Sequence, residues 1–129
     1  CHLDANMITS ALEQIELDGI NLLIIENVGN LVCPTGFDLG EDFKVVLLSV
    51  PEGDDKPLKY PLAFNVSSAL VINKIDLLPY LDFDIEKARN EAQRINPNIE
   101  IFETSCKTGE GLQVWYDWLK AKVKGRDQA

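Results

Sequence analysis

Three polar side chains that could recognise a nucleotide base follow directly after an apolar run at residues 69–72. They are Asn73, Lys74 and Asp76. An ionised aspartate only accepts hydrogen bonds, so Asp76 can take two parallel bonds from the N1–H and the exocyclic amine of guanine. Adenine has no N1 proton and would leave this carboxylate unpaired, which is a strong basis for rejection. Asn73 can donate to N7, and the Lys74 stem can lie along the base. The N-K-x-D spacing predicts a guanine site; the alternative is an aspartate-capped turn.

A second group of candidates, Ser105, Cys106 and Lys107, lies about thirty residues farther along, after another apolar run. Neighbouring parallel strands would place this group beside Asp76, because such strands end at the same edge of a sheet. A backbone N–H here could then meet guanine O6, and the Ser105 hydroxyl could brace the Asp76 carboxylate. By itself the tripeptide is a weak signal, because serine before a helix is commonly only a cap.

Glu26 and Gly29 form a third candidate group, at the end of a predicted strand. A carboxylate at that position can hold Mg²⁺ directly or through water. A glycine three residues later allows its backbone N–H to approach a γ-phosphate. The alternative is an ordinary strand-to-loop turn, and these two residues alone do not decide between the two readings.

Cys1, His2 and Cys33 carry the thiolate and imidazole groups that bind zinc and nickel. A closed zinc site usually has four ligands, so three indicate a site that is open, completed by water or shared across a two-fold axis. The alternative is two small buried cysteines and a surface histidine, and the residues alone favour it. Ligand type does not separate Ni²⁺ from Zn²⁺, and Cys106 is not expected to be a ligand.

Buried strands alternating with amphipathic helices must position these groups. We predict an α/β fold, an open and mostly parallel sheet with helices on both faces. The expected strands are residues 20–25, 44–50, 69–73 and 99–103. The expected helices are one from residue 5 to beyond Ile15, a short one from Pro57, one at 85–95 capped by Asp84, and one at 112–123 that buries Trp115 and is followed by a frayed tail.

Composition narrows the class of protein. The 129 residues are 46% hydrophobic and 26% charged, which suits one ordinary globular domain. The net charge of −9 argues against nucleic acid and anionic membranes as partners. No apolar run approaches the ~20 residues of a membrane-spanning helix, and no signal peptide is recognisable. Three cysteines without framework spacing suit a reducing cytoplasm, so we expect a cytoplasmic protein.

Three stretches resemble the hydrogenase nickel-incorporation GTPases, the HypB family. They are IENVGNLVCP at 25–34, EGDDKPLKYP at 52–61 and VINKIDLLPY at 71–80, and the opening CHLDA is also similar. The resemblance implies a SIMIBI-class P-loop GTPase that uses GTP/GDP and Mg²⁺ and dimerises with nucleotide. It implies a guanine site at Asn73, Lys74 and Asp76, a switch at 26–29, and a nickel or zinc site at Cys1, His2 and Cys33. It also places Lys56 near the dimer interface, facing the nucleotide of the partner.

The chain departs from that family in one respect, because no G-x-x-x-x-G-K-[ST] stretch is present. That motif would cradle the phosphates. We therefore expect residues 1–129 to be the C-terminal part of a single P-loop GTPase domain whose phosphate-binding segment is not in this chain. The family arrangement puts the strand that feeds the phosphate loop between 22–26 and 44–49. Ladder hydrogen bonds between those two stretches would contradict this placement.

The expected function is a GTP-hydrolysing metallochaperone that works with other maturation proteins to deliver nickel to [NiFe]-hydrogenase. One alternative is a related metallochaperone GTPase such as the urease accessory type. Another is a non-catalytic metal-binding or interaction module with a degenerate nucleotide site.

Overall fold

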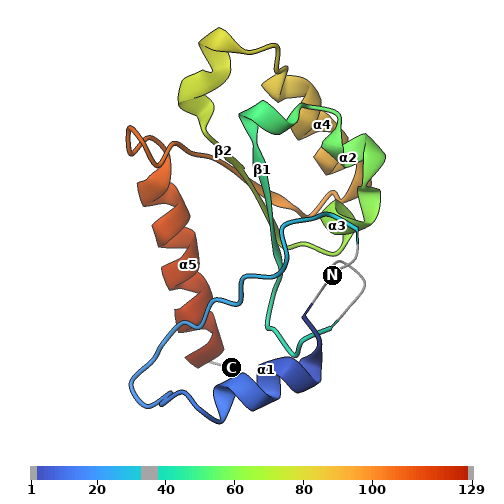
Figure 1. Ribbon diagram of the computed structural model, residues 1–129. Coiled ribbons are helices and arrows are strands. Elements are labelled where there is room, and N and C mark those ends of the chain that lie inside the picture. The colour runs from blue at the N-terminus through green and yellow to red at the C-terminus, as the bar shows by residue number, and fades with distance from the viewer. Residues whose placement is uncertain (1–2, 33–37, 128–129) are drawn as a thin grey trace. The chain divides into compact units, whose positions relative to one another are not determined.

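The computed structural model describes residues 3–32 and 38–127 (Figure 1). The chain divides into two compact units, residues 1–42 and residues 43–129, and each is described by itself.

A three-stranded parallel sheet forms the centre of the second unit. Its strands are β1 (Val45–Ser49), β2 (Ala69–Asn73) and β3 (Glu100–Glu103), in the order β1-β2-β3. The register aligns Ser49 with Asn73 in the first pair and Ile72 with Glu103 in the second. The carboxyl ends of all three strands therefore meet at one edge of the sheet, as the alternation of strands and helices predicted.

Helices cover both faces of this sheet, which confirms the predicted fold class (Figure 1). The helix α5 (Leu112–Asp127) lies on one face. Its Trp115 and Trp118 rings pack on Phe102 of β3, with ring centroids 5.2 and 5.5 Å away. The helices α2 (Lys56–Lys59), α3 (Pro61–Asn65) and α4 (Ile85–Ile95) lie on the other face. The core side chains on β2 are nearly or fully inaccessible, at Ala69, Leu70, Val71 and Ile72.

Polar groups define the ends of α4. Asp84 is the N-cap, as predicted, and its side chain accepts from the Lys87 backbone N–H. At the other end, the Asn96 amide donates to the carbonyl oxygens of Phe64, Asn65 and Ser67. These bonds tie the turn after α4 to the turn before β2, so the helix has a defined position over the sheet.

The first unit contains a single described helix, α1 (Ala5–Leu12), whose N-cap Asp4 accepts from the Met7 backbone N–H. The prediction that this helix extends past Ile15 was wrong. Bonds of the i→i+3 type from Gln14 and Ile15 tighten its last turn, and Ile15 is exposed. A short amphipathic helix gains most of its stability from packing, and its last apolar residue has little to pack against here.

The predicted strand at residues 20–25 was also wrong, since these residues belong to no strand. Ile24 in the middle of the run is 75% exposed. An apolar run becomes a strand only when a neighbour supplies ladder partners for its backbone N–H and C=O groups. No such neighbour is present within the described ranges. Accordingly, residues 22–26 form no ladder with β1. Within the described ranges, the one strand that pairs with β1 is β2.

Smaller differences concern the boundaries of elements. The helix expected from Pro57 is two helices, α2 and α3. Two 3₁₀ helices, η2 (Val50–Glu52) and η3 (Ile75–Tyr80), follow β1 and β2. The fourth predicted strand begins at Glu100, and α5 continues through the predicted frayed tail to Asp127. No helix in the described part of the chain is both long and apolar enough to cross a membrane.

Candidate guanine-binding site

Asn73, Lys74 and Asp76 lie where β2 ends and η3 begins. Lys74 has φ +63°, and among the residues that the structure describes it is the one non-glycine residue with positive φ. Such a conformation costs energy and is found most often where a site requires it. The Ile75 backbone N–H donates to the Thr104 carbonyl oxygen at 3.1 Å, which holds the turn against the segment after β3. The left-handed conformation of Lys74 thus turns the chain sharply between the end of β2 and Asp76, which carries the carboxylate.

Ser105 joins the two loops directly. Its Oγ donates to Oδ1 of Asp76 at 2.7 Å, and the expected brace is therefore present. The same hydroxyl accepts from the Thr108 backbone N–H at 3.1 Å, and Ser105 is fully buried. Because the hydroxyl proton points to one carboxylate oxygen, the orientation of the Asp76 carboxylate is determined by the loop after β3.

Thr104 plays a parallel part for Asn73, which the sequence analysis did not anticipate. Its Oγ1 donates to Oδ1 of Asn73 at 3.1 Å, and the Thr104 side chain is buried. The amide oxygen is then occupied, and the amide NH₂ remains to donate to a base. The one signal in the sequence was a small polar residue placed between a strand and Ser105.

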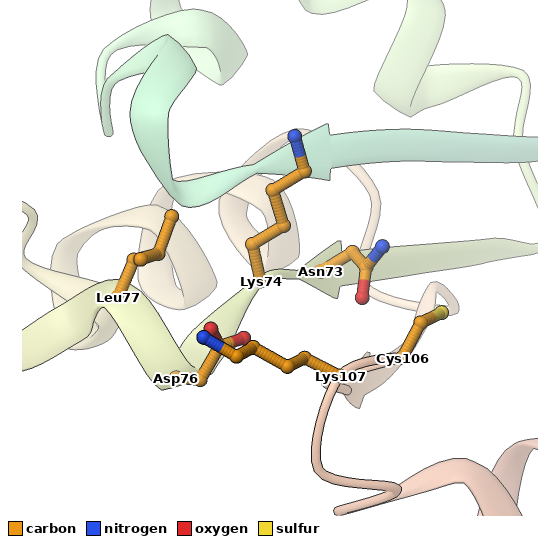
Figure 2. Close-up of a pocket in the computed structure, with 6 residues that line it drawn as sticks. All are labelled: Asn73, Lys74, Asp76, Leu77, Cys106 and Lys107. Carbon is orange, nitrogen blue, oxygen red and sulfur yellow. The ribbon is translucent and has the colours of Figure 1, made fainter.

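Asn73 and Asp76 line a depression of about 330 Å³, near the lower end of the ~300–1,000 Å³ of ligand pockets. Figure 2 shows it at the end of β2 and the loop after β3. The lining residues are Asn73, Lys74, Asp76, Leu77, Cys106 and Lys107. Five of the six were predicted as base-binding residues. Leu77, the sixth, adds an apolar surface, and its place in an apolar stretch gave no sign of this.

The loop between Ser105 and α5 is folded tightly against the end of β3. The Gly109 N–H donates to the Ser105 carbonyl at 2.8 Å, and the Ser105 N–H donates to the Glu110 carbonyl at 2.9 Å. Gly111 has φ +75°, and a Cβ placed on it would lie 1.9 Å from the Glu103 carbonyl oxygen. Only glycine allows this approach of backbone to backbone. The pattern of residues around Gly111 gave no sign of this requirement.

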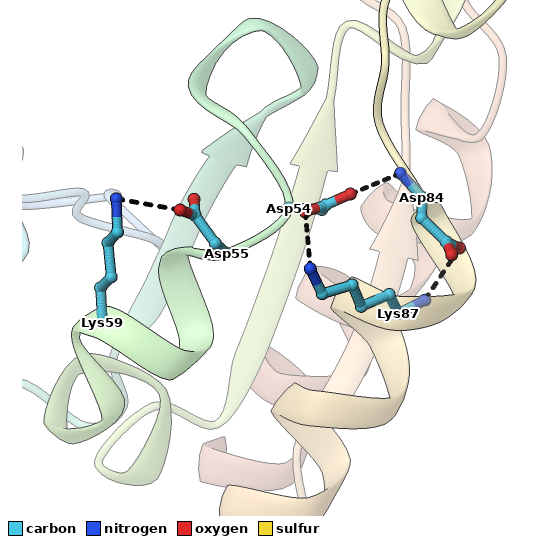
Figure 3. Close-up of polar contacts among 5 residues, drawn as sticks. All are labelled: Asp54, Asp55, Lys59, Asp84 and Lys87. Carbon is cyan, nitrogen blue, oxygen red and sulfur yellow. Dashed lines mark hydrogen bonds and ion pairs between the residues drawn. The ribbon is translucent and has the colours of Figure 1, made fainter.

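Lys56 lies at the start of α2, with its ammonium 5.6 Å from the centroid of the Tyr60 ring. It does not line the depression around Asp76. Nearby, Asp55 and Lys59 form an exposed ion pair at 2.9 Å (Figure 3). Their hydrogen bond lowers the pKa of Asp55 and raises the pKa of Lys59. Solvent screens such a pair, so it adds little to stability.

Glu26 and Gly29 lie in the first unit and are not part of the depression. Glu26 is exposed. The neighbouring Asn27 accepts on Oδ1 from the backbone N–H groups of Leu3 at 3.0 Å and Val28 at 2.8 Å. The residues around Glu26 are therefore tied to the residue that follows Cys1 and His2.

The predicted metal ligands Cys1, His2 and Cys33 lie outside the described residues. Among residues 3–32 and 38–127, no three or more histidine, cysteine, aspartate or glutamate side chains are grouped so as to hold a metal ion.

Comparison with protein families gives a direct match over most of the chain. Residues 1–103 match the family described as CobW/HypB/UreG, nucleotide-binding domain. The chain belongs to this family. A parallel sheet with the N-K-x-D residues at the carboxyl end of its central strand agrees with the nucleotide-binding domain that this family is described by.

Curated members of the family match nearly the whole chain. The hydrogenase maturation factor HypB of Escherichia coli K12 is 55% identical over 95% of this chain and 42% of its own length. The probable hydrogenase maturation factor HypB of Methanocaldococcus jannaschii is 47% identical over 96% of this chain and 56% of its own length. The chain thus spans about half the length of these relatives or less.

Solved structures of family members have the same fold. The crystal structure of HypB from Archaeoglobus fulgidus is 48% identical, with a TM-score of 0.87 over 93% of this chain and 63% of that one. HypB from Helicobacter pylori in complex with nickel is 39% identical, with a TM-score of 0.89 over 98% of this chain and 60% of that one.

Proposed function

We propose that this chain is the base-recognising, C-terminal part of a P-loop GTPase domain, in a metallochaperone that helps deliver nickel during [NiFe]-hydrogenase maturation. The observation that carries the proposal is the hydrogen bond from Ser105 to Asp76 at the rim of the depression. It holds an acceptor-only group in one orientation at the edge of the sheet where ligands of α/β proteins bind. The names of the relatives supply hydrogenase maturation as the process.

Guanine selection follows from the groups in the depression. Asp76 accepts from N1–H and the exocyclic amine, while Asn73, with its oxygen held by Thr104, donates to N7. The backbone N–H groups of Cys106 and Lys107 are the candidates to meet O6. Since adenine would leave the carboxylate unpaired, the site discriminates against ATP.

Glu26 and Gly29 are proposed for the phosphate side of the site. The Glu26 carboxylate is exposed and supplies the oxygen ligand that Mg²⁺ prefers, so the residue fits a Mg²⁺ shell. When bound, Mg²⁺ would neutralise charge on the β- and γ-phosphates. A Cβ placed on Gly29 would meet no atom of the described residues within 4 Å, so that side of its backbone is open.

Cys1, His2 and Cys33 are proposed to hold the cargo metal, nickel or zinc. Two hydrogen bonds support a connection between these residues and the nucleotide switch. Asn27 accepts from Leu3, the residue after His2, and Asn30 accepts on Oδ1 from the Val32 backbone N–H, directly before Cys33. A change around Glu26 on hydrolysis would therefore be transmitted to Leu3 and Val32, which adjoin the proposed ligands in the sequence.

In the intact protein, we further propose a cytoplasmic, GTP-dependent homodimer in which Lys56 faces the nucleotide of the partner. One relative, from Helicobacter hepaticus, is named hydrogenase/urease maturation factor HypB and is 40% identical over 95% of this chain. This name makes delivery of nickel to urease the second candidate function.

The test of guanine recognition is Asp76→Asn in the intact protein. The amide NH₂ would face the exocyclic amine of guanine, donor against donor, so GTP affinity should fall. Xanthosine triphosphate carries a carbonyl oxygen at that position and should gain relative to GTP. Each charge-assisted bond that is lost is worth ~1.5–3 kcal/mol. Titration with fluorescent analogues of both nucleotides measures the effect. Asp82→Asn is the matched control, because Asp82 is an exposed carboxylate nearby that does not line the depression. An unchanged GTP affinity in Asp76→Asn would refute the guanine site.

The metal assignment is tested separately by Cys33→Ala. We expect weaker nickel and zinc binding, while GDP affinity is largely retained, measured by competition with a chromophoric chelator. Cys106→Ala is the control for metal affinity, because Cys106 is an exposed free cysteine outside the proposed ligand set. Metal affinity of the unaltered protein should also fall as the pH is lowered, because thiolate and neutral imidazole must lose protons to bind. If Cys33→Ala bound nickel as tightly as the parent, the three-ligand site would be wrong.

A further inference from the structure

Arg89 connects α4 to the end of β3. Its guanidinium binds Glu86 Oε1 on the same helix at 2.6 Å through Nη1, and Glu103 Oε2 through Nη2. The side chains of Arg89 and Glu103 are 30% and 33% exposed, so this pair is only partly screened by solvent. Its hydrogen bond to Glu103 raises the pKa of Arg89, which stays charged at any working pH.

Glu103 is the last residue of β3 and precedes Thr104 and Ser105. It is held from two sides. Its side chain is bound by Arg89, and its carbonyl oxygen lies only 1.9 Å from the position that a Cβ on Gly111 would take. Small movements of Glu103 are therefore passed to the adjoining loop, because the backbone of that loop packs on it without a gap.

The helix that carries Arg89 is itself anchored. Asp54, in the turn after η2, accepts from the Asp84 backbone N–H at 2.7 Å and pairs with Lys87 Nζ at 3.3 Å (Figure 3). Ala88 and Ala92 of the helix are fully buried. Arg89 consequently extends from an element whose position is determined by the sheet, and its planar guanidinium can impose a position on Glu103.

We propose that Arg89 is a positioning residue for guanine recognition, which holds the end of β3 through Glu103 and so keeps Ser105 in place to orient Asp76. The inference rests on the proposed function. Arg89 does not line the depression, so it acts only through these residues. Lysine cannot replace it fully, because a single ammonium cannot reproduce the fork that binds Glu86 and Glu103 together.

The experiment compares Arg89→Ala, Arg89→Lys and Arg94→Ala in the intact protein. Arg94 is the matched control, because it pairs with Glu91 on the same helix at 3.5 Å, is 77% exposed and makes no bond to β3. Dissociation constants are measured for GDP and for inosine diphosphate. Inosine differs from guanosine only in lacking the exocyclic amine. The ratio of the two dissociation constants therefore reports the hydrogen bond from that amine to Asp76. Thermal unfolding is recorded alongside for each variant.

Arg89→Ala should weaken GDP binding roughly three- to tenfold and reduce the preference for GDP over inosine diphosphate. Arg89→Lys should lie between Arg89→Ala and the parent, and Arg94→Ala should match the parent in both constants. A merely structural ion pair would lower the unfolding temperature and leave the nucleotide preference unchanged, and that result would overturn the proposal. If Arg89→Ala does not fold, Glu103→Gln replaces it in the experiment. We expect the same loss of GDP affinity and preference, because glutamine has nearly the shape of glutamate but not its charge.

A parent protein with no preference for guanine over adenine nucleotides would overturn the proposed function, and the role of Arg89 with it. A parent that prefers GDP, together with an Arg89→Ala variant of unchanged preference, would overturn the role of Arg89 alone.

Discussion

Single hydroxyl groups determine how the acceptors of the candidate site are oriented. Ser105 donates to Asp76, and Thr104 donates to Asn73, each from the segment directly after β3. A free carboxylate or amide would rotate among several orientations, and selecting one of them at the time of binding would reduce affinity. In the proposed guanine site, the two hydroxyl groups would therefore contribute to nucleotide affinity without contacting the base.

This leads to a prediction for Ser105→Ala. Removing the hydroxyl leaves the Thr108 N–H without its partner and frees the Asp76 carboxylate. We expect GDP affinity to fall about fivefold, as for a hydrogen bond worth ~1 kcal/mol, and stability to fall by roughly 1–3 kcal/mol.

The matched control is Ser67→Ala. Ser67 is also buried, and its Oγ donates to the Ala63 carbonyl at 2.7 Å, before the start of β2 and away from the carboxyl ends of the strands. It should lose similar stability in urea unfolding with no loss of GDP affinity. Equal effects of the two substitutions on GDP binding would contradict the role assigned to Ser105.

At the scale of elements, the site depends on how the loop 105–111 returns to the sheet. The loop is closed by its own backbone hydrogen bonds and contacts β3 at Gly111. Because this loop has so little free space, a displacement where it contacts β3 is transmitted to Ser105, its first residue. Position 111 requires glycine both because the loop packs closely on Glu103 and because φ is positive there.

We therefore predict that Gly111→Ala is strongly destabilising. The new Cβ would lie 1.9 Å from the Glu103 carbonyl oxygen, and the positive φ is itself worth ~1–3 kcal/mol of strain. Urea unfolding should show a loss at or above the upper end of that range, together with weaker GDP binding.

Gly125→Ala in α5 is the control for this change. A Cβ there would meet nothing within 4 Å, so it should raise stability by roughly 0.5–1 kcal/mol through helix propensity. A Gly111→Ala variant as stable as Gly125→Ala would show that the loop is not packed as described.

At the scale of the whole molecule, β1 is an edge strand in the described part of the chain. Its five residues pair with β2 on one side, and Leu47 in the middle is 57% exposed. Edge strands with apolar side chains and free backbone groups tend to pair with other chains. The proposed family arrangement places the strand of the phosphate-binding loop along this edge.

The corresponding prediction concerns hydrogen exchange of the β1 amides. In residues 1–129 alone, the amides of 45–48 that do not face β2 should exchange fast. Ser49 is left out because its N–H donates to Glu52 Oε2 at 2.7 Å. In an intact protein with the phosphate-binding segment, they should be protected, because a second ladder is completed. Mass-spectrometric exchange on both forms measures this. Equal protection in both would contradict the proposed neighbour on that side of β1.

The sequence by itself determined the features that rest on local pattern. The apolar run at 69–72 became the central strand β2, because an apolar run of that length is stable in the middle of a parallel sheet, and the run at 45–48 became β1 beside it. Asp84 could be recognised as an N-cap because capping involves only the next three residues. Likewise, the N-K-x-D spacing was enough to place Asn73, Lys74 and Asp76 together, since they lie within four residues at one strand end.

The tertiary structure decided whatever depends on a partner distant in sequence. The run at 20–25 has the same apolar pattern as the true strands, but within the described residues no neighbour completes its ladder, and it forms no strand. The part played by Thr104 appears only when β2 and β3 lie side by side, and the need for glycine at 111 appears only against the Glu103 backbone. Hydrogen-bond pairing and close packing are relations between segments, so the composition of one segment cannot specify them.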